Sequence, residues 1–245
     1  VAAVADARSN PQGDWVNEAR RRGVRILTGS AVVECLGSKR VSGARICAID
    51  AQAGKVVGTG ERIDCDLIAS SGGYSPVVHL ASHLGGRPQW REDILAFVPG
   101  PGNGVQLRID AGAVNGVFSL GEVLTDGYRA GAQAAEEAGF KAVDGSLPKA
   151  EARREEATVA LFLVPHDKPT SRAPKQFVDL QNDVTAAGIE LAVREGFESV
   201  EHVKRYTALG FGTDQGKLGN INGLAIAARA LGISIPQMGT TMFRP

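Results

Sequence analysis

The sequence lacks the features that mark secreted, membrane-spanning and metal-binding proteins. It contains only three cysteines, Cys35, Cys47 and Cys65, and their spacing does not match a metal site. Isolated cysteines in apolar segments are typical of buried free thiols in a reducing compartment. No apolar run reaches about 18 residues, which excludes a transmembrane helix. No charged-then-apolar leader opens the chain, which argues against a secretory signal.

A surplus of one charge sign is also missing. The 27 Lys and Arg residues balance 27 Asp and Glu residues, and the isoelectric point lies near 7.1. Nucleic acids and anionic membrane surfaces select basic proteins, so we expect neither as a partner. The 245 residues, 43% of them hydrophobic, suffice for one large domain or two ordinary ones. Composition therefore indicates a soluble, cytoplasmic protein, and it does not name a reaction.

Both ends of the sequence have the character of internal segments. The chain opens with the apolar residues 1–5 and no methionine, and it stops within the extended residues 240–245. We therefore expect this chain to be a fragment of a longer polypeptide.

The first half has the order of elements found in a Rossmann-type dinucleotide-binding domain. Alternation of apolar and polar residues predicts strands, and a helical stretch between Asp14 and Gly23 predicts a crossover. The expected elements are a buried parallel strand at 1–5, a helix at 15–22, a strand at 24–27, an antiparallel meander at 31–36, 41–49 and 55–58, and a buried strand at 66–70.

One nucleotide-binding signal lies at Asp6. No Gly-x-Gly-x-x-Gly turn precedes it, yet Asp6 stands where a second strand would carry the acid that binds a ribose. Arg8 could instead favour a 2′-phosphate. In the alternative interpretation, Asp6 merely ends a strand and caps the next loop. Gly72 and Gly73, before Pro76, form a corner of the kind that commonly ends the strand returning from an inserted nucleotide domain.

A second nucleotide signal lies at residues 117–138. We expect a short buried strand at 117–120, then Gly121-Glu122, then a small-residue helix that begins at Gly127. This order resembles the C-terminal part of two-dinucleotide-domain flavoproteins. There, the acid meets a ribose or ribityl hydroxyl and the helix N-terminus faces a pyrophosphate. An ordinary strand-to-helix turn with tight packing is the alternative.

The second half changes from charged to compact and helical. Residues 151–156 form a charge run typical of a solvated helix face or linker, and residues 161–164 predict a short strand. Three helices are expected after it: one capped by residues 183–185 and ended by Gly196, one at 200–208 capped by Ser199, and one at 220–231. We therefore expect a partial FAD/NAD(P)-binding-like domain at 1–145, a linker at 146–176 and a small helical domain at 177–245.

Several strings in the helical half resemble the α subunit of heterotetrameric sarcosine oxidase. They are Asp-Leu-Gln-Asn-Asp-Val-Thr at 179–185, Ser-Val-Glu-His-Val-Lys-Arg-Tyr-Thr at 199–207, Thr-Asp-Gln-Gly-Lys at 213–217, Gly-Leu-Ala at 223–225 and Phe-Arg-Pro at 243–245. The resemblance is highly specific over residues 177–245 and mainly architectural over residues 1–145.

The resemblance implies an amine oxidoreductase. Enzymes of this family oxidise the N-methyl group of sarcosine, giving glycine, hydrogen peroxide and a one-carbon unit for tetrahydrofolate. The implied cofactors are NAD or FAD in the nucleotide-binding region and a flavin mononucleotide (FMN) at the interface with the β subunit. The implied partners are the β and other subunits, with tetrahydrofolate bound by a domain absent from this chain. Amine oxidation occurs on the β subunit, so no catalytic residue is expected here.

The helical domain also resembles a two-iron ferredoxin-like module of related amino-acid dehydrogenases. The cluster cysteines of that module correspond here to Asp179, Gln181, Asp214 and Gly219. Cluster ligation requires thiolates, so we predict no iron–sulfur cluster and favour the oxidase branch. The α subunit of a related amino-acid or opine dehydrogenase is one alternative, and a non-catalytic assembly module is another.

Polar residues crowd the start of the last predicted helix. Free backbone N–H groups, the helix dipole and one lysine would suit an anion there, and we expect the turn to face the FMN phosphate. A capped polar turn that stabilises helix packing is the alternative. The expected cofactor-binding residues of this turn are Thr213, Gln215, Gly216, Lys217, Asn220 and Asn222.

The histidines predict no metal or catalytic site. His79 and His83 could share one helix face, but no Glu or Cys is placed to complete a metal site with them. His166 and His202 have no evident acid or base partner in the sequence. We therefore expect these side chains to be structural or solvated.

Overall fold

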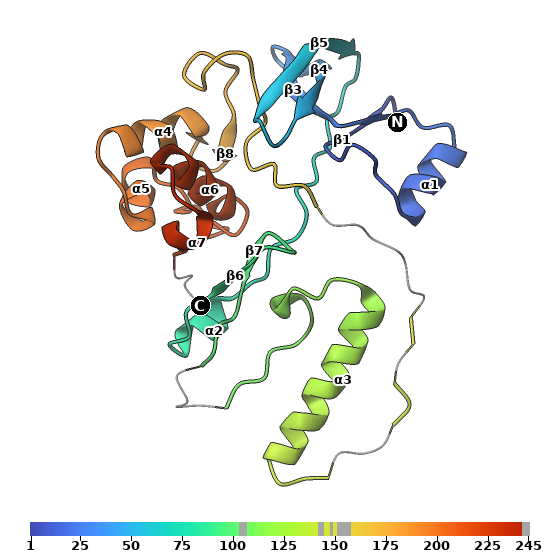
Figure 1. Ribbon diagram of the computed structural model, residues 1–245, viewed down its shortest axis with the longest axis vertical. Coiled ribbons are helices and arrows are strands. Elements are labelled where there is room, and N and C mark those ends of the chain that lie inside the picture. The colour runs from blue at the N-terminus through green and yellow to red at the C-terminus, as the bar shows by residue number, and fades with distance from the viewer. Residues whose placement is uncertain (103–106, 142–144, 148, 151–157, 242–245) are drawn as a thin grey trace. The chain divides into compact units, whose positions relative to one another are not determined.

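The structure, a computed structural model, describes residues 1–102, 107–141, 145–147, 149–150 and 158–241. Its fold is mixed α/β, as expected, and the chain divides into two compact units (Figure 1). The first unit comprises Val1–Gly72 with Glu156–Gly239, and the second comprises Gly73–Glu155 with Thr240–Pro245. The charge run at 151–156 and the string at 243–245 lie outside the described residues.

The first unit begins with a parallel strand pair. Strand β1 (Val4–Asp6) pairs with β2 (Ile26–Thr28), and helix α1 (Asp14–Arg21) connects them. The predicted parallel strand and crossover helix are confirmed. The predicted burial is wrong, because Val1 is 98% and Val4 39% exposed. Within the described residues β1 pairs with β2 alone, so one of its edges is unpaired and it is not enclosed as a central parallel strand would be.

The predicted antiparallel meander is confirmed. Strands β3 (Ser30–Gly37), β4 (Val41–Asp50) and β5 (Lys55–Ile63) pair in the order β3-β4-β5. Strand β5 continues past the predicted end, Gly58, because the pairing shifts register between Ile46 and Ala48. Gly60 has a φ of +72°, and a Cβ there would overlap the Cys47 sulfur. The bulge therefore requires glycine.

Two other predicted strands of this unit do not form. Residues 66–70 are irregular, and Leu67 is 76% exposed. Residues 161–164 are irregular as well, and the Gln176 Nε2 donates to the Val164 carbonyl at 2.7 Å. Both predictions were wrong because an apolar run becomes a strand only beside a partner strand, and the described residues provide none.

The helical part of the first unit follows its predicted caps. Thr185 Oγ1 accepts from the Gly188 N–H at 3.2 Å, and Ser199 Oγ accepts from the His202 N–H at 3.3 Å. Both predicted caps are confirmed. The elements are β8 (Phe177–Asp179), β9 (Val184–Thr185), α4 (Ala186–Arg194), α5 (Val200–Thr207), α6 (Asn220–Leu231) and α7 (Ile235–Met238).

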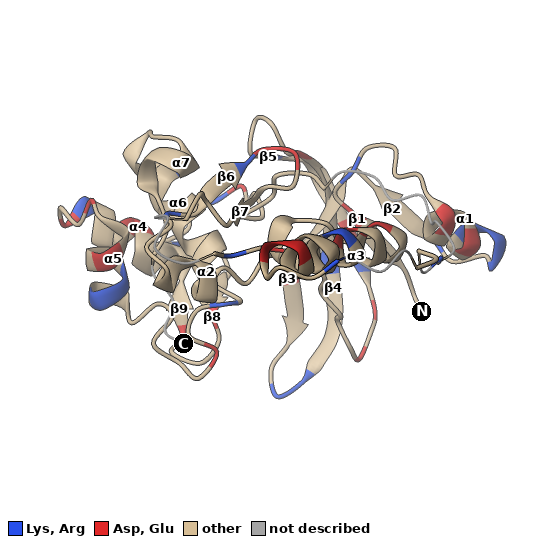
Figure 2. Ribbon diagram, turned by 90° about the horizontal axis from the view of Figure 1, so that it is seen from below, with Lys and Arg blue, Asp and Glu red and all other residues tan. Residues whose placement is uncertain are grey.

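This helical part has a tightly packed core. Helix α6 is its centre and contacts α4, α5 and α7. The largest fully buried side chains there are Ile189, Val203, Leu209, Leu224 and Ile226. The surface carries both charge signs, as Figure 2 shows on α5, which agrees with the balanced composition.

The second unit contains short elements and one long helix. They are α2 (His79–His83), the antiparallel strands β6 (Gln89–Arg91) and β7 (Ala96–Val98), a 3-10 helix η1 (Gly112–Asn115) and α3 (Leu120–Glu137). Arg108 connects several segments, because its guanidinium donates to Asp110 at 2.8 Å and to the Ala81 and Gly100 carbonyls at 3.2 and 2.5 Å.

Helix α3 begins earlier than predicted. The expected strand at 117–120 is absent, and Gly121, Glu122 and Gly127 all lie inside α3. The sequence Ser119-Leu-Gly-Glu122 has the residue types of a helix start, although no side-chain cap hydrogen bond to the backbone forms at Ser119. Ser119 is the N-cap residue, and its hydroxyl donates to the Glu122 carboxylate at 2.7 Å. Among the described residues, no helix has the length and apolarity to cross a membrane.

Candidate functional site

Two segments of the helical part meet around one buried carboxylate. Asp179 ends β8 and is 6% exposed. Its Oδ1 accepts from the Gln181 N–H at 2.8 Å and the Asn182 N–H at 3.0 Å. Its Oδ2 accepts from the Gly210 N–H at 2.9 Å, 31 residues along the chain. Asp179 therefore links β8 to the segment Gly210–Gly219, which we call the polar loop.

The donors around Asp179 keep it charged. Burial by itself raises the pKa of the carboxyl group, because it disfavours the charged form. The backbone N–H groups of Gly210, Asn182 and Gln181 act in the opposite direction, and together they bring the pKa of Asp179 below its ordinary value. The carboxylate is thus a permanent acceptor near neutral pH.

Gln181 and two glycines extend this contact along the polar loop. The Gln181 Oε1 accepts from the Thr213 N–H at 2.5 Å and from the Thr213 hydroxyl at 3.0 Å. A Cβ at Gly212 would overlap the Gln181 amide, and one at Gly219 would lie 2.5 Å from the Val178 carbonyl oxygen. Close approach of the two segments therefore requires glycine at both positions.

The polar loop uses its own backbone N–H groups. The Asp214 carboxylate accepts from the Gly216 N–H at 3.2 Å and the Leu218 N–H at 3.3 Å, and the Asp214 carbonyl accepts from the Lys217 N–H at 3.1 Å. The expectation of free N–H groups at these positions is therefore wrong. An acidic side chain inside a turn satisfies them, as Asp side chains commonly do.

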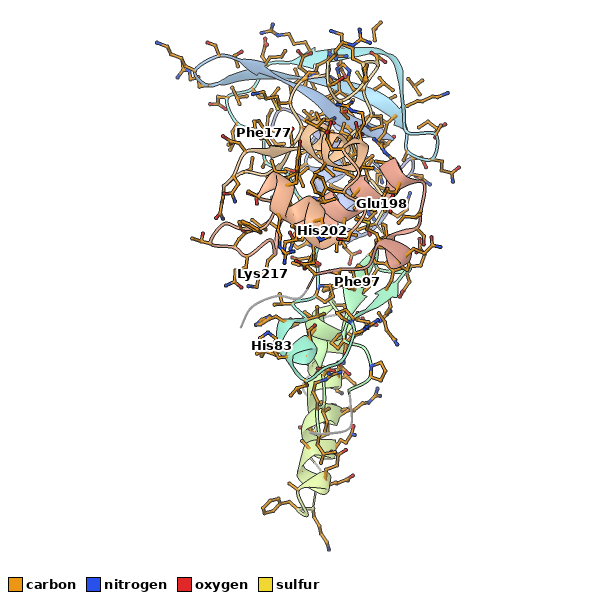
Figure 3. The ribbon with its side chains drawn as sticks, turned by 90° about the vertical axis from the view of Figure 1, so that its left-hand side faces the viewer. His83, Phe97, Phe177, Glu198, His202 and Lys217 are labelled. Atoms are coloured by element: carbon orange, nitrogen blue, oxygen red, sulfur yellow. The ribbon has the colours of Figure 1, made fainter. Side chains whose placement is uncertain are left out.

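The side chains of the polar loop differ in exposure. Lys217 is exposed, and Figure 3 labels it at the outer edge of the helical part. Gln215 has a φ of +53°, and its Oε1 is buried without a hydrogen-bond partner in the described part of the chain. Asn220 is 4% exposed, and its side chain occupies the space that a Cβ at Gly210 or Gly216 would need.

Asn222, the last predicted residue of this turn, lines a different feature. It borders a small cleft together with Gln176 and a set of apolar residues, namely Phe162, Leu163, Val164, Phe177, Val178 and Ile226. The structure therefore gathers Thr213, Gln215, Gly216, Lys217 and Asn220 within the polar loop and its junction with α6, and places Asn222 at the cleft.

Asp6 forms a two-pronged ion pair with Arg8. The Arg8 Nε donates to Oδ1 at 3.0 Å and its terminal nitrogen to Oδ2 at 2.7 Å, and the Arg8 N–H also donates to Oδ1 at 3.0 Å. The Arg8 side chain is the main cause that lowers the pKa of Asp6, against the opposing effect of burial. Asp6 thus lies at the end of β1, and both oxygens of its carboxylate already accept hydrogen bonds from Arg8. A ribose would have to share the carboxylate with Arg8 or displace it.

Most of the remaining nucleotide-binding candidates belong to the second unit, whereas Asp6 belongs to the first. Gly72 ends one segment of the first unit, and Gly73 opens the second unit. In the second unit, Gly121, Glu122 and Gly127 share α3, with Glu122 in its first turn. An acidic side chain is favourable at that end of a helix, with or without a ligand.

The histidines form no metal site in the described residues. No three His, Cys, Asp or Glu side chains gather there as ligands. His166 has partners that the sequence did not reveal: its Nε2 lies 3.4 Å from an Arg45 guanidinium nitrogen, and its Nδ1 accepts from the Lys168 N–H at 3.0 Å. Arg45 also donates to Glu34 at 3.0 Å, so His166 joins residues 162–168 to the meander.

Comparison with known proteins supports the family resemblance. Residues 173–245 match a family model described as "Sarcosine oxidase A3 domain". The whole chain is 38% identical, over 250 aligned positions, to sarcosine oxidase subunit alpha of Corynebacterium sp. (strain P-1), and covers 25% of that protein. The corresponding subunit of Rhizobium meliloti (strain 1021) is 38% identical over 247 positions, with 100% of this chain and 23% of the relative covered. The chain thus spans about a quarter of the length of these curated relatives.

A solved structure supports the fold. The structure resembles that of an L-proline dehydrogenase from P. horikoshii, with a TM-score of 0.65 and 18% identity, covering 99% of this chain and 47% of that chain. The mixed α/β fold is therefore confirmed, and the predicted resemblance to sarcosine oxidase alpha subunits holds along the entire chain.

Proposed function

We propose that this chain is part of the alpha subunit of a flavin-dependent sarcosine oxidase. The observation that carries the proposal is the 38% identity to three such subunits over the whole chain. In this proposal the assembled enzyme, with β and other subunits, oxidises sarcosine to glycine, hydrogen peroxide and a one-carbon unit. A domain outside this chain would pass that unit to tetrahydrofolate. The chain supplies nucleotide binding and one wall of the flavin interface.

The polar loop is the proposed wall of the FMN site. When bound, the flavin supplies the acceptor for the electrons of the amine. Its phosphate is an anion, and Lys217 offers an exposed ammonium group on a long, mobile stem. Because Asp214 and Gln181 already occupy several N–H groups of the loop, Lys217 carries the electrostatic part of the interaction.

Each unit carries its own candidate residue for a dinucleotide, NAD or FAD. Glu122 in the first turn of α3 is exposed and could accept from ribose hydroxyls, at the cost of sharing its hydrogen bond with Ser119. Asp6 could do so by sharing or displacing the ion pair with Arg8, and a displaced Arg8 guanidinium could turn toward a phosphate. In this view the first 145 residues are an incomplete Rossmann-type region of two dinucleotide domains.

The helical part is proposed to be a ferredoxin-like module that binds no iron–sulfur cluster. Asp179, Gln181, Asp214 and Gly219 stand at the four cluster positions, and none offers a thiolate. Three of these side chains instead make hydrogen bonds within or between the two segments. This arrangement favours the oxidase over an amino-acid dehydrogenase that needs a cluster.

A segment exchange tests the proposed function. The matching quarter of the Corynebacterium alpha subunit is replaced by this chain and produced with its partner subunits. We expect sarcosine-dependent oxygen uptake and peroxide formation. An assembled, flavin-loaded chimera that leaves sarcosine unoxidised would refute the proposal. Reduction of a dye by another amino acid, without oxygen uptake, would instead support the dehydrogenase alternative.

A charge substitution in the same chimera tests the phosphate assignment. Lys217→Met keeps much of the apolar stem and removes the charge, so flavin content should fall and should fall further at high ionic strength. Lys175→Met, which removes another exposed charge of this unit, is the control and should leave flavin content unchanged. Full flavin content in Lys217→Met at every salt concentration would make the polar loop purely structural.

A further inference from the structure

We propose that Asp179 and Gln181 are positioning residues, which hold the polar loop in the one placement that brings Lys217 to the flavin phosphate. We call these two side chains, with the hydrogen bonds that they accept from the polar loop, the clamp. The clamp rests on contacts within this chain, and only its effect on flavin binding rests on the proposed function. Neither side chain touches the cofactor in this proposal. Asp179 acts through the Gly210 N–H of the loop, and Gln181 acts through the N–H and the hydroxyl of Thr213.

The clamp fixes the polar loop at its start, its middle and its end. Asp179 accepts from Gly210 at the start, and Gln181 accepts from Thr213 in the middle. At the end, Gly219 lies directly against the Val178 carbonyl. A loop attached at three points to one short strand and its turn cannot shift as a body without breaking several contacts at once.

The interior of the polar loop is strained and needs such support. Gln215 has a φ of +53°, an uncommon conformation for a residue with a side chain. Conformations of this kind persist only where surrounding contacts determine them. Asp214 supplies the contacts within the loop, through its bonds to the Gly216 and Leu218 N–H groups. The link from the loop to the strand comes from Asp179 and Gln181.

The chemistry of position 179 requires a carboxylate. Three backbone N–H groups converge on the two oxygens of Asp179, and both oxygens can only accept. Asparagine has the same size, but its amide group would present N–H to one of these donors. The side chain is also 6% exposed, so water cannot replace the lost acceptor. Asp179→Asn therefore loosens the clamp with little change in shape.

The test uses the full alpha subunit in the assembled enzyme and two independent measurements. Hydrogen exchange of the peptide that contains residues 210–216 reports the clamp, and flavin content after dialysis in salt reports the phosphate contact. We expect Asp179→Asn to speed exchange of this peptide by about tenfold, because a buried N–H loses a charged acceptor. Flavin retention should fall to the level of Lys217→Met. The double variant should be no worse than Lys217→Met alone, because both changes act on one interaction.

Controls separate the clamp from a general loss of stability. Asp183→Asn removes an exposed carboxylate four residues from Asp179, at a left-handed position that asparagine tolerates. It should alter neither measurement. Gln181→Met removes the exposed half of the clamp and should speed exchange at Thr213 to a smaller extent. It carries the same test if Asp179→Asn prevents folding.

Three results would overturn the inference, and they separate the clamp, its positioning role and the assignment of Lys217 to the flavin phosphate. Unchanged loop exchange in Asp179→Asn and Gln181→Met would refute the clamp. Faster exchange with normal flavin retention, while Lys217→Met loses flavin, would refute positioning and leave the phosphate site intact. Faster exchange with normal retention in all variants would refute the phosphate assignment as well.

Discussion

Acid should release the polar loop from β8 while the rest of the helical part is still folded. The pKa of Asp179 lies below its ordinary value in the folded protein, because three backbone N–H donors outweigh the effect of burial. A carboxyl group of this kind stabilises the fold fully above its unfolded-state pKa of about 3.9. The stabilisation is lost as the pH falls through the lower, folded-state pKa.

The magnitude follows from the contacts that protonation weakens. The bonds from Gln181 and Asn182 are local, so the bond from Gly210 is the one that joins the two segments. A hydrogen bond to a charged group contributes about 1.5–3 kcal/mol, which corresponds to roughly tenfold to a hundredfold in local opening. The opening should be confined largely to the polar loop, because the fully buried side chains of the helical core are apolar. Acid also weakens the partly exposed pair of Glu190 and Arg229, but such pairs contribute little, about 0–1 kcal/mol.

Hydrogen exchange measured at about pH 6 and again below about pH 3 reports this opening, once the rates are corrected for those of free peptides. Protection of the peptide spanning residues 210–216 should fall with acid in the wild type. In Asp179→Asn, protection of the Gly210 N–H should be low and independent of pH, and the Gly216 N–H, which donates to Asp214 instead, is read separately. Equal corrected protection at both ends of the range, or the same pH dependence in Asp179→Asn, would show that the carboxylate does not hold the loop.

Further predictions concern the core, the nucleotide and the cluster. Ile189→Ala should destabilise the helical part by about 2–5 kcal/mol and Ile189→Val by about 0.5–1.5 kcal/mol in denaturant titrations, and similar losses for both would argue against a tightly packed site. In the full-length subunit, Glu122→Ala should weaken NAD binding by about 1–3 kcal/mol in calorimetry. Ser119→Ala, which frees the carboxylate from its neighbour, should not weaken it, and equal affinity in all three proteins would remove Glu122 from the site. Purified protein should contain neither iron nor acid-labile sulfide, and stoichiometric amounts of both would contradict the loss of the cluster. The isolated chain should form no peroxide from sarcosine, because the proposed catalytic groups belong to another subunit.

Local signals in the sequence predicted the elements whose hydrogen-bond partners lie nearby in the sequence. The meander formed as expected because its three strands are consecutive and satisfy one another. The caps at Thr185 and Ser199 were also predictable, since a cap needs only a hydroxyl and an N–H three residues later. In each case the partner lies nearby in the sequence.

Elements that depend on distant partners were not predictable in this way. The apolar runs at 66–70 and 161–164 have the composition of strands, but the described residues give them no neighbouring strand. The start of α3 was missed for a different reason. The hydrophobic pattern at 117–120 suggested a strand, whereas Ser119 and Glu122 have the residue types and spacing of a helix start.

The candidate site shows the same division between local and distant information. The sequence identified Asp179 and Gln181 through the absence of cysteine, but it could not indicate what they do instead. Their partners, Gly210 and Thr213, lie about thirty residues away, beyond the reach of any turn or helix pattern. In the structure these acceptors join the segments through backbone N–H groups, which every residue except proline carries. A link of this kind leaves little side-chain signature on the loop, apart from the Thr213 hydroxyl, which also donates to Gln181, and the glycines at 212 and 219 that permit the close approach.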